Sequence, residues 1–403
     1  MERIVLAYSG GLDTTVAIPW LAEKYGAEIV AVTMDLGQGK GLEDARDRAL
    51  AAGAVRAHVL DVREEFARGH ILPALQADAM YEDRYPIGTA LGRPLIARKL
   101  VEIAAIEQAA AIAHGCTGRV NDQVRFEVAV HALSPATVVM APAGDCGMTR
   151  SEKIEYTRKR GVAVPATVDS PYSIDVNLWG RSIAGGVLDD PGAEPPEEIY
   201  SITKRPVDCP DEAACVEITF DRGVPTAING VAMPLVELIA SLGTIAGAHG
   251  VGRADIVENR VVGIKSREVY EAPAALVLHM AHKELQRTVT TKDADRFSQS
   301  VSLQYADVVY SGLWFTPLRE ALDAYVAKVQ ERVSGVIRLK LFKGDCRVVG
   351  RTSSFALHDQ ALAAYDAGDA FDHAGFIKVR GSAFRRPRPA KAGSHRSWIA
   401  RKA

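Results

Sequence analysis

The sequence predicts an α/β protein with a doubly wound, mostly parallel sheet, followed by an α+β domain and a C-terminal arm. Three observations support this fold class. Short apolar runs rich in valine and isoleucine alternate with segments of helical periodicity through residue 166. The first apolar run leads through a glycine-rich turn directly into a helical segment. From residue 167 the alternation gives way to hairpin patterns and longer helices.

Each element of the first domain (1–166) follows from this alternation. Parallel strands with right-handed crossovers place the loops that follow them on one edge of the sheet, where ligands bind. The stretch 113–127 is expected to follow a long helix as a polar, glycine-interrupted loop that opens the next helix. The helix at 151–160 is expected to lack a capping box. We expect strands at 3–8, 28–34, 56–60 and 137–141, and helices at 12–25, 42–52, 95–114, 123–133 and 151–160.

The second domain (167–372) is predicted to be α+β. We expect hairpins at 216–228 and 336–350, a charged strand-like stretch at 256–271, and helices at 235–246, 273–288, 294–312 and 317–333. Residues 170–175 and 179–182 are expected to be irregular, and 189–198 an exposed loop. The basic segment 373–403 contains two prolines, and we expect a terminal arm that is either solvated or embraces a neighbouring subunit. The alternative for this arm is contact with RNA or phosphate.

Composition narrows the class of protein. The chain has 403 residues and a net charge of −2, which argues against a broad surface for polyanions. It has no apolar run long enough for a membrane span and no signal-peptide pattern. Its five cysteines are scattered, which is typical of reduced thiols. We therefore expect a cytoplasmic protein without membrane or nucleic-acid partners. His279 and His282 are expected to be ordinary helix residues rather than zinc ligands.

The stretch from Ala7 to Thr15 predicts a phosphate-binding loop. A strand, a Gly-Gly turn and a helix N-terminus bring several backbone N–H groups to one point, and such a point attracts anions. The chain contains no Walker A motif, and the stretch lacks the G-x-G-x-x-G order of a dinucleotide site. Asp13 could hold a metal ion or a bound amine. The alternative is an ordinary glycine-rich turn.

Two further loops are candidates for ligand contact. Residues 34–39 could shape an adenine or ribose pocket or could be a simple turn at a strand end. In the second loop, Asn121 or Asp122 could cap the helix that follows. Capping does not explain Arg125 in the first helical turn, where a cation opposes the helix dipole. Binding of a substrate carboxylate would offset that cost.

The loop resembles the S-G-G-[LM]-D-[ST] motif of the PP-loop ATP pyrophosphatases. Further motifs are similar to those of the argininosuccinate synthase family and span both domains. They are D-L-G-Q-G at 35–39, Y-E-D-R-Y-P at 81–86, R-P-L-I-A at 93–97, H-G-C-T-G at 114–118, N-D-Q-V-R-F-E at 121–127, and G-V-G-R-A-D-I-V-E-N-R with G-I-K-S-R-E-V-Y-E within 250–271.

The resemblance implies a C–N-forming ligase of arginine biosynthesis and the urea cycle that uses ATP, Mg²⁺, L-citrulline and L-aspartate. The citrulline ureido oxygen would attack the α-phosphorus, and aspartate would displace AMP from the citrullyl-adenylate. The family is homotetrameric. By this resemblance ATP would contact Ala7, Tyr8, Ser9, Gly10, Gly11, Leu12, Asp13, Thr14, Thr15, Met34 and Gly115. Aspartate would contact Thr117, Asn121 and Asp122, and citrulline Tyr85, Asn121, Arg125, Ser173, Ser182, Glu258 and Tyr270. The catalytic candidates are Ser9, Asp13 and Asp122, and the metal ligands are not identified.

The sequence departs from the family pattern at a few positions. Ala90 stands where a serine or threonine is frequent, Gly92 replaces an alanine, Val120 replaces a glycine, and 141–144 read A-P-A-G instead of A-P-W-R. Three alternatives therefore stay open. They are a paralogous PP-loop ligase with other amino-acid substrates, a tRNA-thiolating PP-loop enzyme, and a nucleotide-binding regulatory protein without turnover. The lack of paired cysteines in suitable loops argues against the thiolating enzyme.

Overall fold

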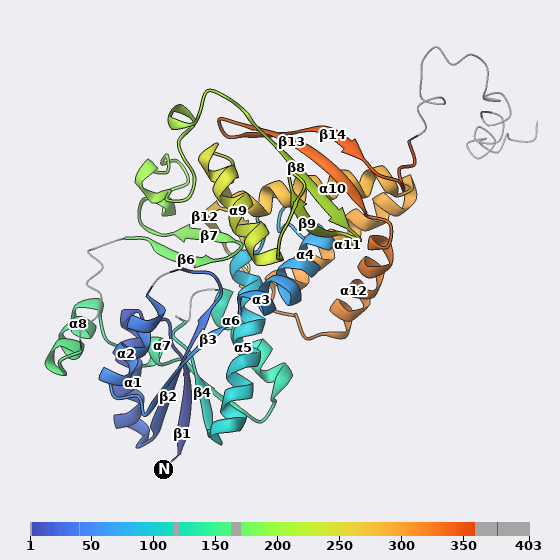
Figure 1. Cartoon of the computed structure of the whole chain (residues 1–403). Helices are drawn as coiled ribbons and strands as arrows, with labels where there is room; N and C mark the ends of the chain where they lie inside the picture. Colours follow the sequence, from blue (N-terminus) through green and yellow to red (C-terminus); the bar gives the residue numbers. More distant parts are fainter. Residues whose placement is uncertain (1, 40, 117–120, 163–170, 359–376, 378–403) are drawn as a thin grey trace, which may run out of the picture. The chain divides into compact units, whose positions relative to one another are not determined.

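The computed structural model describes residues 2–39, 41–116, 121–162, 171–358 and 377 (Figure 1). The chain divides into two units, 1–357 and 358–403, and the description that follows concerns the first. Both domain boundaries expected from the sequence, near 166 and 372, fall outside the described residues. So does the basic arm, apart from Ile377. Among the described residues, no helix combines the length and the apolar character needed to cross a membrane.

The first sheet is parallel throughout, as predicted. Its strand order is β3-β2-β1-β4-β5, so the chain starts in the middle and builds outward in both directions. This order makes the ends of β1 and β4 neighbours at the carboxyl edge. The strands are β1 (Arg3–Ala7), β2 (Glu28–Asp35), β3 (Arg56–Asp61), β4 (Ala111–Ala113) and β5 (Val138–Met140).

Helices cover both faces of this sheet (Figure 1). Ile4 and Leu6 of β1 pack with Ile18 of α1, whereas Val5 joins the cluster on the other face that contains Leu95 of α5. This alternation confirms the doubly wound fold. The helices of this half are α1 (Leu12–Tyr25), α2 (Leu42–Ala51), α3 (Arg63–Phe66), the π-helix η1 (Ala67–Ile71), α4 (Leu72–Gln76), α5 (Gly88–Glu107), α6 (Asn121–Leu133), α7 (Pro142–Asp145) and α8 (Arg150–Lys159).

The single long helix expected at 95–114 is wrong. Helix α5 ends at Glu107, where Gln108 adopts a left-handed conformation with φ 51°. Residues 111–113 then form β4, which is fully buried between β1 and β5. Two of the three residues in A-I-A are alanine, and burial in the middle of the sheet overrides the helical preference of alanine. The polar loop at 114–116 therefore follows a central strand and not a helix.

In the second half, the described residues form two antiparallel sheets and four long helices, which confirms the α+β prediction. The first sheet has the order β10-β9-β8-β13-β14 and the second β11-β12-β7-β6. The strands are β6 (Ser173–Asn177), β7 (Gly180–Ala184), β8 (Ala214–Asp221), β9 (Val224–Ile228), β10 (Val231–Ala232), β11 (Arg253–Asn259), β12 (Lys265–Glu271), β13 (Gly335–Phe342) and β14 (Asp345–Thr352). The helices are α9 (Leu235–Ala248), α10 (Pro273–Val289), α11 (Lys292–Tyr310) and α12 (Pro317–Gln330), with 3₁₀ turns η2 (Gly186–Asp189), η3 (Glu197–Ile199) and η4 (Pro206–Asp208).

The irregular structure expected around 170–182 is also wrong, because β6 and β7 form a hairpin there. Its strands are short, and β7 gains its second partner from β12, almost ninety positions away along the chain, at the pair Tyr270–Ser182. The expected stretch at 256–271 is itself a hairpin, β11–β12. Pairing over such distances leaves no local signal in the sequence.

The β6–β7 hairpin packs on the carboxyl edge of the first sheet. The backbone N–H of Leu178 donates to the Leu36 carbonyl at 2.7 Å, and Asn177 Nδ2 donates to the Gly88 carbonyl at 2.9 Å. Gly37 allows this approach, since a Cβ on it would lie 2.8 Å from Leu178 Cβ and its φ is +95°. Residues from both halves share one apolar cluster. The sheet β11-β12-β7-β6, called the hairpin sheet from here on, is thus held against the C-terminal end of β2 and the N-terminal end of α5.

His279 and His282 both have partners within the protein. His279 Nδ1 lies 3.2 Å from Asp78 Oδ1, and His282 Nε2 lies 2.8 Å from Gln330 Oε1. Both rings are buried on α10 and serve packing between helices. Within the described residues, no cluster of three histidine, cysteine or acidic side chains is suited to hold a metal ion.

Another buried histidine predicts an acid-sensitive fold. His70 is 1% exposed and stacks on Trp314 at 4.7 Å between ring centroids. Burial, together with the nearby Arg98 cation, lowers the pKa of His70 to about 3. In the unfolded chain His70 therefore gains a proton near pH 6.5, whereas in the folded chain it stays neutral down to about pH 3. Stability should fall by roughly 1.4 kcal/mol per pH unit across this window.

Urea denaturation between pH 7 and 4 checks this expectation. H70F should lose the His70 contribution, so its stability should fall less steeply with acid than that of the wild type. H131N, which changes an exposed histidine on α6, should retain the wild-type slope. Parallel curves for wild type and H70F would contradict the assignment.

Candidate functional site

The loop between β1 and α1 has the geometry expected of an anion-binding cradle. Gly10 takes φ +78°, and a Cβ there would lie 3.1 Å from both Ala45 Cβ and Arg48 Nη1, so glycine is required. Gly11 is the N-cap of α1 and no side chain caps the helix, which leaves the first N–H groups of α1 for a ligand. Ser9 Oγ lies 3.2 Å from Thr14 Oγ1. Both hydroxyls stand beside these N–H groups, as a phosphate cradle requires.

Two cations that the sequence did not indicate lie at this loop. Arg48 Nη1 on α2 donates to the Gly10 carbonyl at 2.7 Å, and Lys153 Nζ on α8 lies 2.8 Å from Asp13 Oδ1. Lys153 is only 8% exposed. The amine that Asp13 holds is thus a side chain of the same protein, and Lys153 brings a positive charge to a loop that has no lysine of its own.

Helix α8 begins with a capping box, so the expectation that it lacks one is wrong. Thr149 is the N-cap and accepts from the Glu152 N–H, while Glu152 Oε2 accepts from the Thr149 N–H at 2.7 Å. The box starts two residues earlier than the helix boundary read from the sequence. The box fixes the first turn of α8, and Lys153 directly follows Glu152, the last residue of the box.

The other two ATP-binding candidates lie at the same sheet edge. Met34 is the next-to-last residue of β2 and is buried, and its carbonyl accepts from Gln38 Nε2 at 2.5 Å. Thr33 Oγ1 donates to the Tyr8 carbonyl at 2.9 Å, which ties the ends of β1 and β2 together. Gly115 follows β4, where a Cβ on it would lie 2.5 Å from Thr14 Cγ2. The structure therefore brings together all the ATP-binding residues named from the sequence.

The contact between Gly115 and Thr14 predicts a loss of ATP binding in G115A. The added methyl group would push against Thr14 and displace the loop, and overpacking of this kind costs ~1–3 kcal/mol. We expect the KM for ATP to rise about tenfold or more. T14S removes Cγ2 and keeps the hydroxyl, so the double variant T14S/G115A should recover most of the loss. An unchanged KM in G115A, or no recovery in the double variant, would contradict the close packing.

A cluster of guanidinium and carboxylate groups lies at the start of α6. Arg93 Nη2 on α5 donates to Asp122 Oδ2 at 2.8 Å and also bonds Asp175 on β6. Arg125 Nη1 donates to Asp122 Oδ1 at 2.9 Å. Burial alone would raise the pKa of Asp122, but the two guanidinium groups outweigh it and hold the pKa well below the usual range. Asp122 is therefore an ionised group and a poor proton acceptor.

Arg125 is buried, and one nitrogen of its guanidinium group is available to bind a ligand. It is 4% exposed, its Nε donates to the Tyr310 carbonyl at 2.6 Å, and its guanidinium lies 4.4 Å from the Tyr310 ring centroid. Its Nη2 has no hydrogen-bond partner among the described residues. A buried donor without a partner is costly, and a substrate carboxylate would satisfy it.

Two tyrosines hold Glu258 in place beside this cluster. Glu258 is 2% exposed, and its carboxylate oxygens accept from the hydroxyls of Tyr270 at 2.6 Å and Tyr310 at 2.5 Å. Asn121 Nδ2 donates to the Tyr310 hydroxyl at 2.8 Å, which connects Glu258 to α6. Burial raises the pKa of Glu258. Asn121 and Asp122 are the first two residues of α6, and the capping position before them lies outside the described residues.

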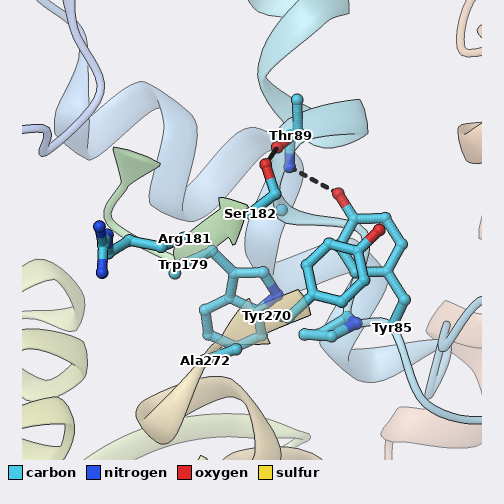
Figure 2. A pocket seen from close by; sticks show the side chains of 10 residues that line it. Tyr85, Thr89, Trp179, Arg181, Ser182, Tyr270 and Ala272 are labelled. Carbon is cyan, nitrogen blue, oxygen red and sulfur yellow. Dashed lines mark hydrogen bonds between the residues drawn. The ribbon is translucent and has the colours of Figure 1, made fainter. Parts of the chain in front are cut away.

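A pocket with an empty volume of about 210 Å³ opens next to this cluster (Figure 2). Tyr85 and Tyr270 stack at 4.0 Å between ring centroids and form one wall. Figure 2 shows Thr89 bound to both neighbours: its N–H donates to the Tyr85 hydroxyl at 3.0 Å, and its Oγ1 lies 3.3 Å from Ser182 Oγ. Three of the citrulline candidates from the sequence thus line a common cavity.

The remaining candidates have different outcomes. Ser173 is exposed on β6, on the same strand face as Asp175 but not in the lining of the pocket. Thr117 lies outside the described residues. Sequence reasoning missed five residues that the fold brings into the site, namely Arg48, Arg93, Lys153, Asp175 and Tyr310. The motif around Arg93 was a usable signal for that residue, whereas Lys153 and Tyr310 are surrounded by ordinary helical sequence.

Comparison with known proteins gives the same family over both halves. Residues 3–163 match the model of the arginosuccinate synthase N-terminal HUP domain, and 172–385 match that of the arginosuccinate synthase C-terminal domain. The argininosuccinate synthase of Rubrobacter xylanophilus is 53% identical over 97% of each chain. That of Symbiobacterium thermophilum is 54% identical over 94% of this chain and 96% of the relative.

One solved structure, a 4-thiouridine synthetase bound to RNA and ATP, matches 40% of this chain and 41% of that chain. Its identity of 23% and TM-score of 0.30 are too low to support an argument. The two family models and the near-full-length relatives decide the assignment. The chain belongs to the argininosuccinate synthase family.

Proposed function

We propose that this site joins citrulline to aspartate in two steps, with the roles of the residues set out below. The overall reaction of the family is an ATP-dependent ligation that gives argininosuccinate, AMP and pyrophosphate through a citrullyl-adenylate. The single observation that supports these roles best is the placement of an anion cradle, Ser9 to Thr15, and of the Arg125–Glu258 cluster. The cradle follows β1 of the first sheet, and Arg125 lies on α6, which follows β4 of that sheet. Glu258 comes from β11 of another sheet, and Tyr310 bonds both Glu258 and Arg125.

The cradle binds the pyrophosphate portion of ATP. The uncapped N-terminus of α1 and the Ser9 hydroxyl donate hydrogen bonds, and Lys153 neutralises charge as pyrophosphate leaves. Asp13 offers one carboxylate to Mg²⁺, which favours sites built from one or two carboxylates and substrate phosphates. When bound, Mg²⁺ would neutralise phosphate charge. The backbones at Met34 and Gly115 line the rest of the ATP site.

Citrulline binds between the pocket and the cluster. Glu258 attracts its ammonium group, and Arg125 Nη2 with Asn121 holds its carboxylate. Tyr85, Tyr270 and Ser182 line the pocket for the side chain, which points toward the cradle. Ser173 stays a citrulline residue by the family resemblance alone. Positioning of the ureido oxygen against the α-phosphorus then supplies most of the rate enhancement.

Aspartate binds at the start of α6 through Thr117, Asn121 and Asp122. Asp122 keeps its negative charge and attracts the ammonium group. The adenylate carries the activation, so no protein nucleophile is required. Cys116 agrees with this: burial raises the pKa of its thiol to about 12, so the thiol stays protonated. The same shift disfavours the alternative of a tRNA-thiolating enzyme that would act through this cysteine.

An omission assay tests the proposed function. Purified protein with Mg-ATP, citrulline and aspartate should form argininosuccinate, AMP and pyrophosphate in equal amounts, and omission of either amino acid should stop turnover. ADP and phosphate as products would rule out the adenylate. Turnover that continues without citrulline would favour the second candidate, a paralogous ligase with other amino-acid substrates. Ala90 is the departure from the family pattern that keeps this candidate open, because it is buried next to Thr89. No product at all would favour the regulatory protein.

We also propose a cytoplasmic homotetramer, on the strength of the family resemblance and the basic arm at 373–403. Light scattering of the purified protein should give about four times the monomer mass of 43.3 kDa. A chain truncated after residue 372 should assemble less stably. A monomeric mass for the full chain would contradict the proposal.

A further inference from the structure

A carboxylate that the roles above leave unused lies on the same sheet face as the citrulline residues. Side chains alternate between the faces of a strand, so Glu268 on β12 shares its face with Tyr270. Glu258 pairs with Ser266 and Ile256 with Glu268, which makes Glu258 and Glu268 diagonal neighbours on that face. Ser182, opposite Tyr270, also points to this side. Glu268 therefore faces the site and not the opposite side, where Glu271 pairs with Arg181.

The groups around Glu268 favour a carboxyl that can gain and lose a proton near neutral pH. Its side chain is 14% exposed and its Oε1 lies 3.5 Å from Arg260 Nη2. Burial and the repulsion of Glu258 raise the pKa of Glu268 to about 7, Arg260 opposes the shift, and Asp122 adds to it. A general base works best when its pKa is close to the working pH.

The second step of the reaction needs such a group. Aspartate arrives with a protonated ammonium group, which has no lone pair for attack. Asp122 is bound by two guanidinium groups that stabilise its ionised form, and Glu258 already accepts from two tyrosine hydroxyls. Glu268 lies on the same sheet face as Glu258, and its contact with Arg260 at 3.5 Å is longer than the two guanidinium bonds of Asp122 at 2.8 and 2.9 Å.

We propose that Glu268 is the catalytic base that takes a proton from the aspartate ammonium group before it attacks the citrullyl-adenylate. This proposal rests on the proposed function. One proton passes from nitrogen to the Glu268 carboxylate, and the freed lone pair forms the C–N bond at the ureido carbon. The C–O bond to AMP then breaks with its electron pair on the phosphate oxygen, and the second amine proton passes to water as the guanidinium group forms.

Two assays separate this role from a structural one. Rapid-quench measurement of pyrophosphate from ATP and citrulline, without aspartate, reports the first step alone. Steady-state argininosuccinate formation reports both steps. E268Q should form pyrophosphate at the wild-type rate and make argininosuccinate about 100-fold more slowly, within the usual range for loss of a general base. Its rate should rise about tenfold per pH unit, because the amine must lose its proton to water, whereas the wild-type rate should level off above about pH 7.

R260Q is the matched control, because it removes the ion pair and keeps the carboxylate. It should retain the wild-type maximal rate, with the plateau shifted to higher pH, and E268D should recover part of the activity. The proposal is overturned if E268Q slows both steps equally, if its pH profile matches the wild type, or if R260Q loses as much turnover as E268Q. A wild-type protein that forms no pyrophosphate from ATP and citrulline would overturn the proposed function itself.

Discussion

E258Q is expected to raise the KM for citrulline about 100-fold and to leave the KM for ATP nearly unchanged. Glu258 is buried and faces the proposed position of the citrulline ammonium group, so the substitution removes a charge from a site shielded from water. Loss of one partner of such a buried pair costs roughly 3 kcal/mol. Glutamine has the same shape and can still bond Tyr270 and Tyr310, so the fold should survive. Initial rates at varied citrulline and fixed ATP give the result.

A substrate analogue makes this test specific. 5-Ureidopentanoate is citrulline without its α-amino group. The wild type should bind it far more weakly than citrulline, whereas E258Q should bind the two with similar affinity. Y310F is the matched control, because it removes one hydrogen bond to Glu258 but no charge, and its discrimination between the two compounds should persist. If E258Q still prefers citrulline by the wild-type factor, Glu258 does not contact the ammonium group.

R93M is expected to lower the free energy of unfolding by about 3–5 kcal/mol and to abolish most of the activity. Arg93 bridges Asp122 on α6 and Asp175 on β6, and thereby ties the first sheet to the hairpin sheet. Methionine fills much of the same volume but leaves two carboxylates without this partner, and breaking a buried ion pair from one side is strongly destabilising. Urea denaturation at pH 7 and steady-state rates provide the two measurements.

Acid distinguishes the electrostatic effect of R93M from lost packing. In the wild type the pKa of Asp122 is depressed, so its contribution to stability is complete above about pH 4 and is lost as the pH falls further. In R93M that pKa rises, and the deficit relative to the wild type should shrink as the pH is lowered toward 4. R93M/D175N should recover part of the stability at pH 7, because it removes one unpaired charge. A deficit that is constant with pH and not relieved by D175N would indicate packing alone.

Local signals predicted the parts of the site that are built from consecutive residues. The cradle at Ser9 to Thr15 depends on one strand, two glycines and one helix start, so its chemistry could be read directly. The parallel sheet followed from alternation of apolar runs and helices. By contrast, Lys153 reaches Asp13 across 140 positions, and Tyr310 reaches Asn121 across 189. No periodicity in the sequence encodes such contacts.

The wrong expectations have a related cause. Strand β4 is short and alanine-rich, and only its place between β1 and β5 makes it a strand. The β6–β7 hairpin likewise depends on β12. In both cases long-range pairing outweighs local propensity. Correcting β4 changes the account of the site, since Gly115 now follows a central strand beside the cradle and contacts Thr14 directly.

Transfer of the ureido oxygen tests the central claim most directly. Citrulline labelled with ¹⁸O in its ureido group should give its label to the phosphate of AMP, because this oxygen attacks the α-phosphorus and then leaves with AMP when aspartate attacks. Mass spectrometry of the nucleotide and of pyrophosphate reads the outcome. We predict one ¹⁸O atom in each AMP formed and none in pyrophosphate. Label in pyrophosphate or in water, with unlabelled AMP, would contradict the adenylate mechanism.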